Sequence, residues 1–265
     1  MRSVPGAELT RPLAGKIAVV TGASGDIGGA TARRLAELGA SVGPNYWTNE
    51  SGAARALQAI EGSGGKAVLL RGDVGTERDV AEMDARVRSA LGPVTLLVNN
   101  AGFGAEHNQV EDLTLDEWNR VIATNLTAAF LCTKAFVPGM LQQGGGRIVN
   151  VSSICELSGD CDPAYSASKA GLLGLTRSCA ARLAPTIQVN AVLPGFVGTK
   201  YHETHKDLVR GVAPDGRLAA PEEVSEVIGF LLSMSSGFLT GACLPIDGGA
   251  SVASLGMHMD WIRGK

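Results

Sequence analysis

Tyr165 and Lys169 are the side chains of this sequence whose spacing is best suited to acid–base chemistry. They lie four residues apart, and on a helix this spacing makes two side chains neighbours on one face. A free phenol has a pKa of about 10 and exchanges protons poorly at neutral pH, but an adjacent ammonium group favours the phenolate and lowers that pKa. Ser152 and Ser153, about a dozen residues earlier, could hold a substrate oxygen against the phenol. Ordinary solvated helix faces also carry such pairs, so the spacing alone does not establish catalysis.

A segment near the N-terminus has the pattern of a phosphate-binding turn. The apolar run 17–20 leads into residues 21–28, Thr-Gly-Ala-Ser-Gly-Asp-Ile-Gly, and an alanine-rich helical pattern over 30–38 ends at Gly39. Strand, glycine turn and helix in this order can bind a dinucleotide, because glycines let the backbone approach a pyrophosphate and the helix start presents free N–H groups. An ordinary glycine-rich turn between a strand and a helix would look similar locally.

Together these segments resemble the short-chain dehydrogenase/reductase superfamily over residues 13–249. The family's turn reads Thr-Gly-x-x-x-Gly-x-Gly; Thr21, Gly22 and Gly28 match it, whereas Asp26 replaces the middle glycine. A carboxylate would repel a pyrophosphate unless it pointed away, so we expect Asp26 to be the N-cap of the following helix.

Further motifs follow in the family's order and spacing. Residues 99–102, Asn-Asn-Ala-Gly, match the turn beneath the cofactor, and residues 194–199 match the Pro-Gly…Thr segment that meets the nicotinamide carboxamide. Asp73 and Val74 resemble the pair that meets the adenine, and the Asp-Gly-Gly of residues 247–249 closes the pattern.

The resemblance implies an oxidoreductase that transfers hydride between a nicotinamide and a ketone or secondary alcohol. Tyr165 would be the acid/base, and Ser153 would hydrogen-bond the substrate oxygen. Lys169 would lower the tyrosine pKa and hold the nicotinamide ribose, while Asn125 would hold a water that links Lys169 to solvent. The interval from Ser153 to Tyr165 is one residue shorter than is usual in the family, so Ser152 remains an alternative. The implied cofactor-binding residues are Gly22, Ser24, Asp26, Ile27, Gly28, Tyr46, Trp47, Thr48, Asn49, Asp73, Val74, Asn99, Ala101, Gly102, Tyr165, Lys169, Pro194, Gly195, Val197 and Thr199.

The end of the second predicted strand bears on the choice of cofactor. NAD-specific relatives have an aspartate there that accepts hydrogen bonds from ribose hydroxyls, whereas residues 45–49 read Asn-Tyr-Trp-Thr-Asn. No carboxylate would repel a 2′-phosphate, and Thr48, Asn49 and Ser51 could donate hydrogen bonds to it. We therefore predict NADP(H), although no arginine marks the site.

Composition narrows the class of protein. The chain has 265 residues, 45% of them hydrophobic, enough to bury one large α/β core. A net charge of −3 with no cluster of Lys and Arg argues against nucleic acid and membrane partners, and no apolar stretch approaches the about 20 residues that span a bilayer. The five cysteines include no Cys-x-x-Cys pair, which favours reduced thiols and a cytoplasmic location. Residues 202–205, His-Glu-Thr-His, fit a solvated loop better than a metal site, and we expect no metal.

Apolar strands alternate with helices along the chain, which is typical of a parallel sheet covered on both faces. The sequence predicts strands at 17–21, 41–46, 67–71, 94–98, 147–151, 188–193 and 243–246, and further helices at 50–61, 76–91, 116–140, 164–183 and 221–234. We expect one doubly wound Rossmann α/β domain over 13–249, with a parallel seven-stranded sheet flanked by helices. A loose tail over 1–12 would precede it, and a C-terminal extension over 250–265 would follow.

The expected substrate pocket is mostly apolar, which favours an uncharged ketone or alcohol. Residues 199–212 would form a mobile lid, and the C-terminal extension would lie over the opening. The expected walls are Phe103, Cys155, Leu157, Phe196 and Tyr201.

Two other functions remain open. The first is 3-oxoacyl-carrier-protein reduction, which the neutral turn 142–146 weakens because an acidic carrier needs Lys or Arg around the entrance. The second is a non-catalytic NADP(H)-binding regulator, which would not need the four intact catalytic residues. Apolar helix faces around Phe130 and Leu172 predict a homo-oligomer, with a tetramer expected from relatives.

Overall fold

The structure, a computed structural model, describes residues 11–107, 109–158, 161–199 and 213–253. The expected lid beyond Thr199, including Tyr201, the segment 202–205 and most of the C-terminal extension lie outside the described residues. Nearly all of the expected N-terminal tail does so too.

Seven parallel strands form one sheet in the order β3-β2-β1-β4-β5-β6-β7, which confirms the predicted architecture. β3 is shorter than expected, because Ala67 makes only an isolated bridge to Val42 before the two-residue strand. The strands are β1 (Ile17–Val20), β2 (Ser41–Tyr46), β3 (Leu70–Arg71), β4 (Leu96–Asn99), β5 (Gly146–Val151), β6 (Ile187–Pro194) and β7 (Cys243–Ile246).

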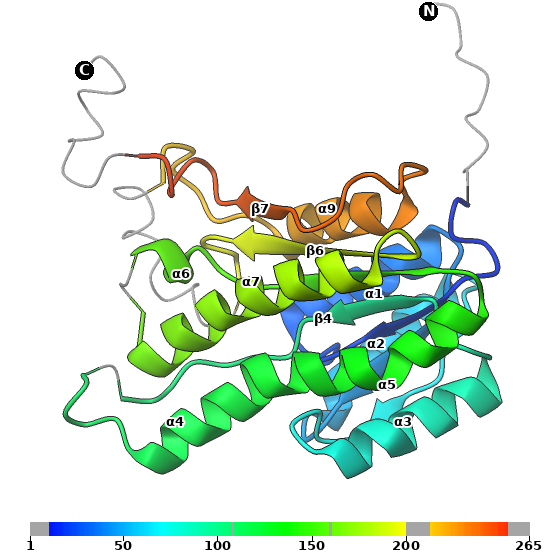
Figure 1. Cartoon of the computed structure of the whole chain (residues 1–265), viewed down its shortest axis with the longest axis horizontal. Coiled ribbons are helices and arrows are strands. Elements are labelled where there is room, and N and C mark those ends of the chain that lie inside the picture. The colour runs from blue at the N-terminus through cyan, green and yellow to red at the C-terminus, as the bar shows by residue number, and fades with distance from the viewer. Residues whose placement is uncertain (1–10, 108, 159–160, 200–212, 254–265) are drawn as a thin grey trace, which may run out of the picture.

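Helices cover both faces of the sheet, because alternate strand residues point to opposite sides. Ala18 and Val20 belong to one core and Val19 to the other. The first core is covered by α1 (Asp26–Glu37), α2 (Glu50–Gly62) and α9 (Pro221–Ser233). The second is covered by α3 (Glu77–Ala90), α5 (Ala128–Gln142) and α7 (Pro163–Leu183). In Figure 1, α5 and α7 lie in front of the sheet and α1 lies behind it.

The helix expected at 116–140 is continuous but not uniform. It comprises α4 (Leu115–Ile122), the π-helix η1 (Ala123–Thr127) and α5. Its 28 residues are long and apolar enough to cross a membrane by length and composition, so the expectation that no stretch approaches this length is wrong. Cys132, Phe136 and Met140 nevertheless pack in the second core, as in the core helix of a Rossmann domain.

The strand order reverses between β1 and β4, because the chain builds the sheet outward from β1 in one direction and then from β4 in the other. In open parallel sheets a ligand binds at such a reversal, outside the carboxyl ends of the strands. The predicted glycine turn follows β1, and the Asn-Asn-Ala-Gly turn follows β4. The fold therefore brings both motifs to this one edge of the sheet.

Candidate functional site

The glycine turn between β1 and α1 is packed so tightly that only glycine fits at two positions. Gly22 has φ +65°, and a Cβ there would lie 2.8 Å from Ala101 Cα. At Gly28 a Cβ would lie 2.4 Å from the Gly22 carbonyl oxygen. Ser24 and Ile27 lie on the same turn, half-buried. The two glycines thus allow the turn after β1 to pack closely on itself and on the turn after β4.

Asp26 does not have the expected role of helix N-cap. Gly25 occupies the N-cap position with no side-chain cap bond, and Asp26 is the first residue of α1. A carboxylate in the first turn is favoured by the positive end of the helix dipole. The N-cap expectation is therefore wrong by one position.

Asn45, near the end of β2, connects the glycine turn to two strands. Its Oδ1 accepts a hydrogen bond from the Gly22 N–H at 3.1 Å, and its Nδ2 donates to the carbonyls of Leu70 and Gly72, both at 3.0 Å. Asn45 is 2% exposed. This role was not predicted, although an asparagine near the end of a largely apolar strand was the available signal.

Two polar side chains of the segment after β2 form hydrogen bonds within that segment or to the glycine turn. Asn49 caps α2, because its Oδ1 accepts from the Gly52 N–H at 3.0 Å, and its Nδ2 donates to the Ser24 carbonyl at 3.0 Å. Ser51 donates its hydroxyl proton to Asn49 Oδ1 at 3.1 Å. Of the three expected phosphate donors, Thr48 is the one without such a bond among the described residues.

Arg71, at the end of β3, is a cation that the sequence analysis did not connect with this segment. Its guanidinium carbon lies 5.9 Å from the centroid of the Trp47 ring. Trp47 is about half exposed, whereas Tyr46 beside it is buried. The register Tyr46↔Arg71 explains the approach, and only the strand pairing reveals it.

The predicted adenine pair occupies a tight turn after β3. Asp73 Oδ1 accepts from the Gly75 N–H at 2.9 Å, and the Asp73 N–H donates to Asp79 Oδ2 at 2.9 Å. The Val74 side chain packs in the second core. An adenine contact by Val74 would therefore use its backbone.

The turn after β4 is held directly against the glycine turn. The Thr21 hydroxyl accepts hydrogen bonds from the N–H groups of Asn100, at 2.9 Å, and Ala101, at 3.0 Å. Asn99 points away from the crevice and donates to Asn150 Oδ1 at 2.8 Å. The amide of Asn99 thus supports the strands beneath the site.

Tyr165 and Lys169 lie on α7, one turn apart as predicted. Lys169 is 3% exposed, its Nζ donates to the Val151 carbonyl at 2.8 Å and lies 5.3 Å from the centroid of the Tyr165 ring. Burial lowers the pKa of Lys169 to about 8. A Cβ at Gly102 would come within 3.3 Å of Lys169 Nζ, so a larger residue there would crowd the ammonium group.

The two serines after β5 have different partners. Ser152 donates its hydroxyl proton to the Lys169 carbonyl at 2.9 Å, which ties β5 to α7. Ser153 Oγ accepts from the Cys155 N–H at 3.2 Å, and among the described residues its own hydroxyl proton has no acceptor. This arrangement favours Ser153 over Ser152 as the group that meets a substrate oxygen.

Asn125 lies in the π-helix η1, a distortion frequent at functional sites. Its Oδ1 accepts from the Phe103 N–H, and its Nδ2 donates to the Phe103 carbonyl and to Ser168 Oγ, all at 3.0 Å. Its amide therefore joins α7 to the segment after β4.

Asp162 is a further residue that the sequence analysis missed. It caps α7, because its Oδ1 accepts from the Tyr165 N–H at 2.7 Å, and its Oδ2 accepts from the Ala105 N–H at 3.1 Å. An aspartate followed by Pro163 at the start of a helix was the available signal. Asp162 thus joins the helix of Tyr165 to the segment after β4.

Cys155 and Cys161 form a disulfide with a Cα–Cα distance of 5.8 Å, so the expectation of reduced thiols is wrong for this pair. The other three cysteines, Cys132, Cys179 and Cys243, are free thiols. Six residues separate the bonded pair, a spacing with no recognisable motif. The short helix α6 (Cys155–Ser158) brings the chain back to the start of α7. The disulfide lies between Ser153 and Tyr165 in the chain.

The segment after β6 is clamped between β7 and the residues that follow β5. The Gly195 N–H donates to the Ile246 carbonyl at 2.9 Å, and Pro194 accepts from the Ile154 N–H at 3.2 Å. Val197 is buried and Thr199 half-buried. This predicted nicotinamide-side segment therefore reaches the same crevice as Ser153.

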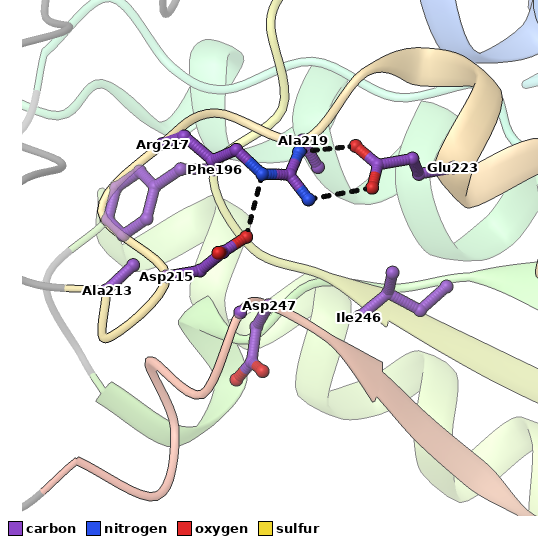
Figure 2. Close-up of a pocket in the computed structure, with 9 residues that line it drawn as sticks. Phe196, Ala213, Asp215, Arg217, Ala219, Glu223, Ile246 and Asp247 are labelled. Atoms are coloured by element: carbon purple, nitrogen blue, oxygen red, sulfur yellow. Dashed lines mark hydrogen bonds and ion pairs between the residues drawn. The ribbon is translucent and has the colours of Figure 1, made fainter.

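Figure 2 shows a pocket behind this segment that differs from the expected apolar one. Phe196 lines it as expected, but Arg217 crosses it, with hydrogen-bonded ion pairs to Asp215 at 2.9 Å and to both oxygens of Glu223 at 2.6 and 2.9 Å. The hydrogen bond from Arg217 lowers the pKa of Glu223 to about 2. These charges pair with one another, and Glu223 also accepts from the Ala220 N–H at 2.8 Å, so the cluster fixes the start of α9. Of the other expected walls, Phe103 is exposed beside Asn125 and Cys155 is bonded to Cys161.

The crevice fits a nicotinamide dinucleotide. Gly22 and Gly28 let the turn after β1 pack directly against the turn after β4, and the start of α1 presents backbone N–H groups to the crevice. The segments after β2, β3 and β6 line the same edge of the sheet.

Comparisons with known proteins agree with this geometry. The family model described as enoyl-(acyl carrier protein) reductase matches residues 22–251. The chain is 42% identical over 240 residues to cis-4-hydroxycyclohexanecarboxylate dehydrogenase of Sinomonas cyclohexanicum, covering 88% of this chain and 96% of that protein. It is 37% identical over 243 residues to a 3-oxoacyl-[acyl-carrier-protein] reductase of Pseudomonas aeruginosa, covering 89% and 98%.

Solved structures give the same result. A dehydrogenase/reductase from Sinorhizobium meliloti superposes with a TM-score of 0.83 at 34% identity, covering 91% of this chain and 97% of that one. A double mutant of a Serratia marcescens short-chain dehydrogenase/reductase superposes with a TM-score of 0.84 at 32% identity, covering 91% and 99%. The chain therefore belongs to the short-chain dehydrogenase/reductase family and is similar to its 3-oxoacyl-carrier-protein reductases.

Proposed function

We propose that the chain is an NADP(H)-dependent oxidoreductase that interconverts a ketone and a secondary alcohol, with Tyr165 as the acid/base. Family membership supplies the coarser part, an oxidoreductase of CH–OH and C=O groups that binds a nicotinamide cofactor. The observation that carries the proposal is the buried Lys169 ammonium group, held by the Val151 carbonyl within 5.3 Å of the Tyr165 ring centroid.

The roles of the side chains follow from this arrangement. When bound, the cofactor supplies or accepts hydride at its nicotinamide ring. Tyr165 donates a proton to the substrate oxygen in reduction and removes it in oxidation, and Lys169 stabilises the phenolate. Ser153 donates its free hydroxyl proton to the same oxygen and stabilises developing negative charge. Asn125 and Asp162 hold the segment after β4 against α7, so that the crevice keeps its width.

The preference for NADP(H) rests on the end of β2. Tyr46 occupies the position where NAD-specific relatives have an aspartate, so no carboxylate there competes with a 2′-phosphate. The remaining cofactor-binding residues are proposed as the sequence analysis assigned them, with Val74 and Asn99 contributing through their backbone.

The substrate class we favour is a small ketone or alcohol of low polarity. Reduction of a 3-oxoacyl group on a carrier protein is the second candidate, because relatives with that name align over nearly their whole length. The neutral turn 142–146 no longer counts against it, since the turn precedes β5 and lies at the opposite edge of the sheet from the site. A cytoplasmic location and a homotetramer complete the proposal, without nucleic acid, membrane or metal partners.

The test is turnover and cofactor binding of Tyr165→Phe. Removing the ionisable oxygen should lower the turnover number at least about 100-fold, while NADPH affinity by calorimetry stays within about twofold. Lys169→Ala should damage both properties, because Lys169 serves the phenol and the ribose. If Tyr165→Phe kept more than a few per cent of the rate, the acid/base role and the enzyme proposal would be wrong, and a binding regulator would be the better account.

A further inference from the structure

We infer that Arg71, supported by the Trp47 ring, is the cation that selects the 2′-phosphate of NADP(H). The inference rests on the proposed cofactor, NADP(H). It assigns the preference for NADP(H) over NAD(H) to a charged side chain, whereas the sequence suggested only the neutral donors Thr48, Asn49 and Ser51. Arg71 is 25 positions away from Tyr46 in the chain, and the pairing of β2 with β3 brings the two residues side by side.

The position of Arg71 follows from strand geometry. Tyr46 ends β2 at the place where an aspartate would contact the adenosine ribose, and Arg71 is its register partner on the neighbouring parallel strand. Side chains of register partners leave a sheet on the same face. The guanidinium group then lies 5.9 Å from the centroid of the Trp47 ring, the residue that directly follows Tyr46. The cation thus lies at the ribose end of the crevice.

The charge of Arg71 is available for a ligand. Arg71 is exposed, and within the described residues it forms no ion pair. Other exposed arginines in the same region are paired, such as Arg78 with Glu82 at 3.0 Å and Arg88 with Asp84 at 2.8 Å. An aromatic ring can hold a guanidinium in place without neutralising it, and a planar guanidinium can donate two parallel hydrogen bonds to a phosphate.

The neutral donors nearby are poorly placed to supply this selectivity alone. Asn49 is engaged with Gly52 and Ser24, and Ser51 donates to Asn49. Thr48 and backbone N–H groups remain, and these carry no full charge. A charged partner favours a dianionic 2′-phosphate over a hydroxyl more strongly than neutral donors do, and Arg71 is the cation that the strand pairing brings beside the end of β2.

The experiment measures binding of adenosine 2′,5′-bisphosphate and of adenosine 5′-monophosphate by calorimetry, since these probes differ only in the 2′-phosphate. NADPH and NADH are titrated in parallel. The variants are Arg71→Gln, Arg71→Lys and Trp47→Leu, with Arg86→Gln as the control, because Arg86 is an exposed arginine of α3 outside the crevice. Thermal unfolding of each variant verifies that it is folded.

Arg71→Gln should weaken the bisphosphate and NADPH about tenfold or more, while the monophosphate and NADH change less than about twofold. Arg71→Lys should retain part of the preference, Trp47→Leu should lose a smaller part, and Arg86→Gln should bind like the wild type. The wild-type preference should also decrease as salt rises.

Two results would overturn the inference while leaving the cofactor proposal intact. One is a full 2′-phosphate preference in Arg71→Gln; the other is equal weakening of both probes, which would mark a structural role. A wild type that binds both probes equally would instead refute the NADP(H) preference, and the role of Arg71 with it.

Discussion

Lys169 is a charged group that is buried, and its burial lowers the free energy of unfolding by an amount that depends on pH. Its pKa in the folded protein is about 8, compared with 10.5 for a free lysine, because burial disfavours the ammonium form. Below pH 8 the Lys169 amine is charged in both the folded and unfolded states, so the destabilisation caused by burying it is fully present. Between pH 8 and 10.5 the folded protein releases the proton first, so stability rises with pH.

The same argument predicts how the stability of Lys169→Met, compared with that of the wild type, changes with pH when no cofactor is bound. At 1.36 kcal/mol per pKa unit, the stability of the wild type relative to this variant should increase by up to about 3 kcal/mol between pH 7 and pH 10. Urea unfolding at the two pH values measures the change. Lys66→Met, which removes an exposed lysine, should show no comparable change. A difference between Lys169→Met and wild type that stayed constant with pH would contradict this account.

At the scale of elements, the start of α7 is fixed by one carboxylate. Asp162 accepts from the Tyr165 N–H and from the Ala105 N–H, so it holds both the helix and the segment that faces Tyr165. Asp162→Ala should lower the free energy of unfolding by about 1 kcal/mol, as for other lost N-caps, and lower the turnover number about tenfold. Asp162→Asn keeps an oxygen for the cap and should recover most of the stability.

Asp116→Ala is the matched control, because Asp116 lies in the first turn of α4 but does not cap it. Turnover that stayed at the wild-type value in Asp162→Ala would limit Asp162 to a role in stability.

The Cys155–Cys161 disulfide closes a short loop between Ser153 and α7. Reducing it should destabilise the fold by roughly 2 kcal/mol, since the unfolded chain regains freedom. It should also raise KM for the substrate, because the Ser153 hydroxyl is held by the Cys155 N–H. Assays with and without dithiothreitol test this, and a variant with both cysteines replaced by serine should behave as the reduced protein and ignore the reductant. Kinetics unaffected by reduction would show that the loop holds Ser153 without the bond.

At the scale of the whole molecule, a patch of apolar side chains remains exposed on the outer face of α4 and α5. Leu115, Phe130 and Leu141 are 72%, 50% and 49% exposed, and exposed apolar surface along a helix can mark an interaction surface. We expect a tetramer at micromolar concentration, and Phe130→Glu should reduce the mass measured by light scattering. Val110→Glu, at an exposed apolar residue outside these helices, should not. A monomeric wild type would refute the assembly.

The sheet and its helices were predictable because the periodic spacing of apolar residues and the glycine-containing turns are local features of the sequence. All seven strands lie where the sequence analysis expected them, with β3 shortened at its start. The placement of Tyr165 and Lys169 one turn apart on a helix was predictable because a four-residue spacing is itself local. The N-cap of α1 was misplaced, since Gly25 and Asp26 both favour helix starts.

The parts that were missed depend on contacts between distant segments. Arg71 approaches Trp47 only through the β2–β3 register, and Asn45 reaches Gly22 across two strands. The disulfide joins Cys155 and Cys161 just before the start of α7, and the pocket of Figure 2 brings Glu223 of α9 and Ile246 of β7 together. A single sequence does not show which distant segments contact each other, so these distances could not be predicted from it.

The buried amide of Asn45 has a consequence for how this enzyme could change during evolution. The Asn45 amide joins the glycine turn to the carbonyls of Leu70 and Gly72, and within the described residues Trp47 and Arg71 take no part in these hydrogen bonds. Trp47 and Arg71 can therefore be exchanged by mutation with little loss of foldedness. Descendants of this chain could acquire a new coenzyme specificity in a few steps, whereas a lineage that lost Asn45 would lose the site itself.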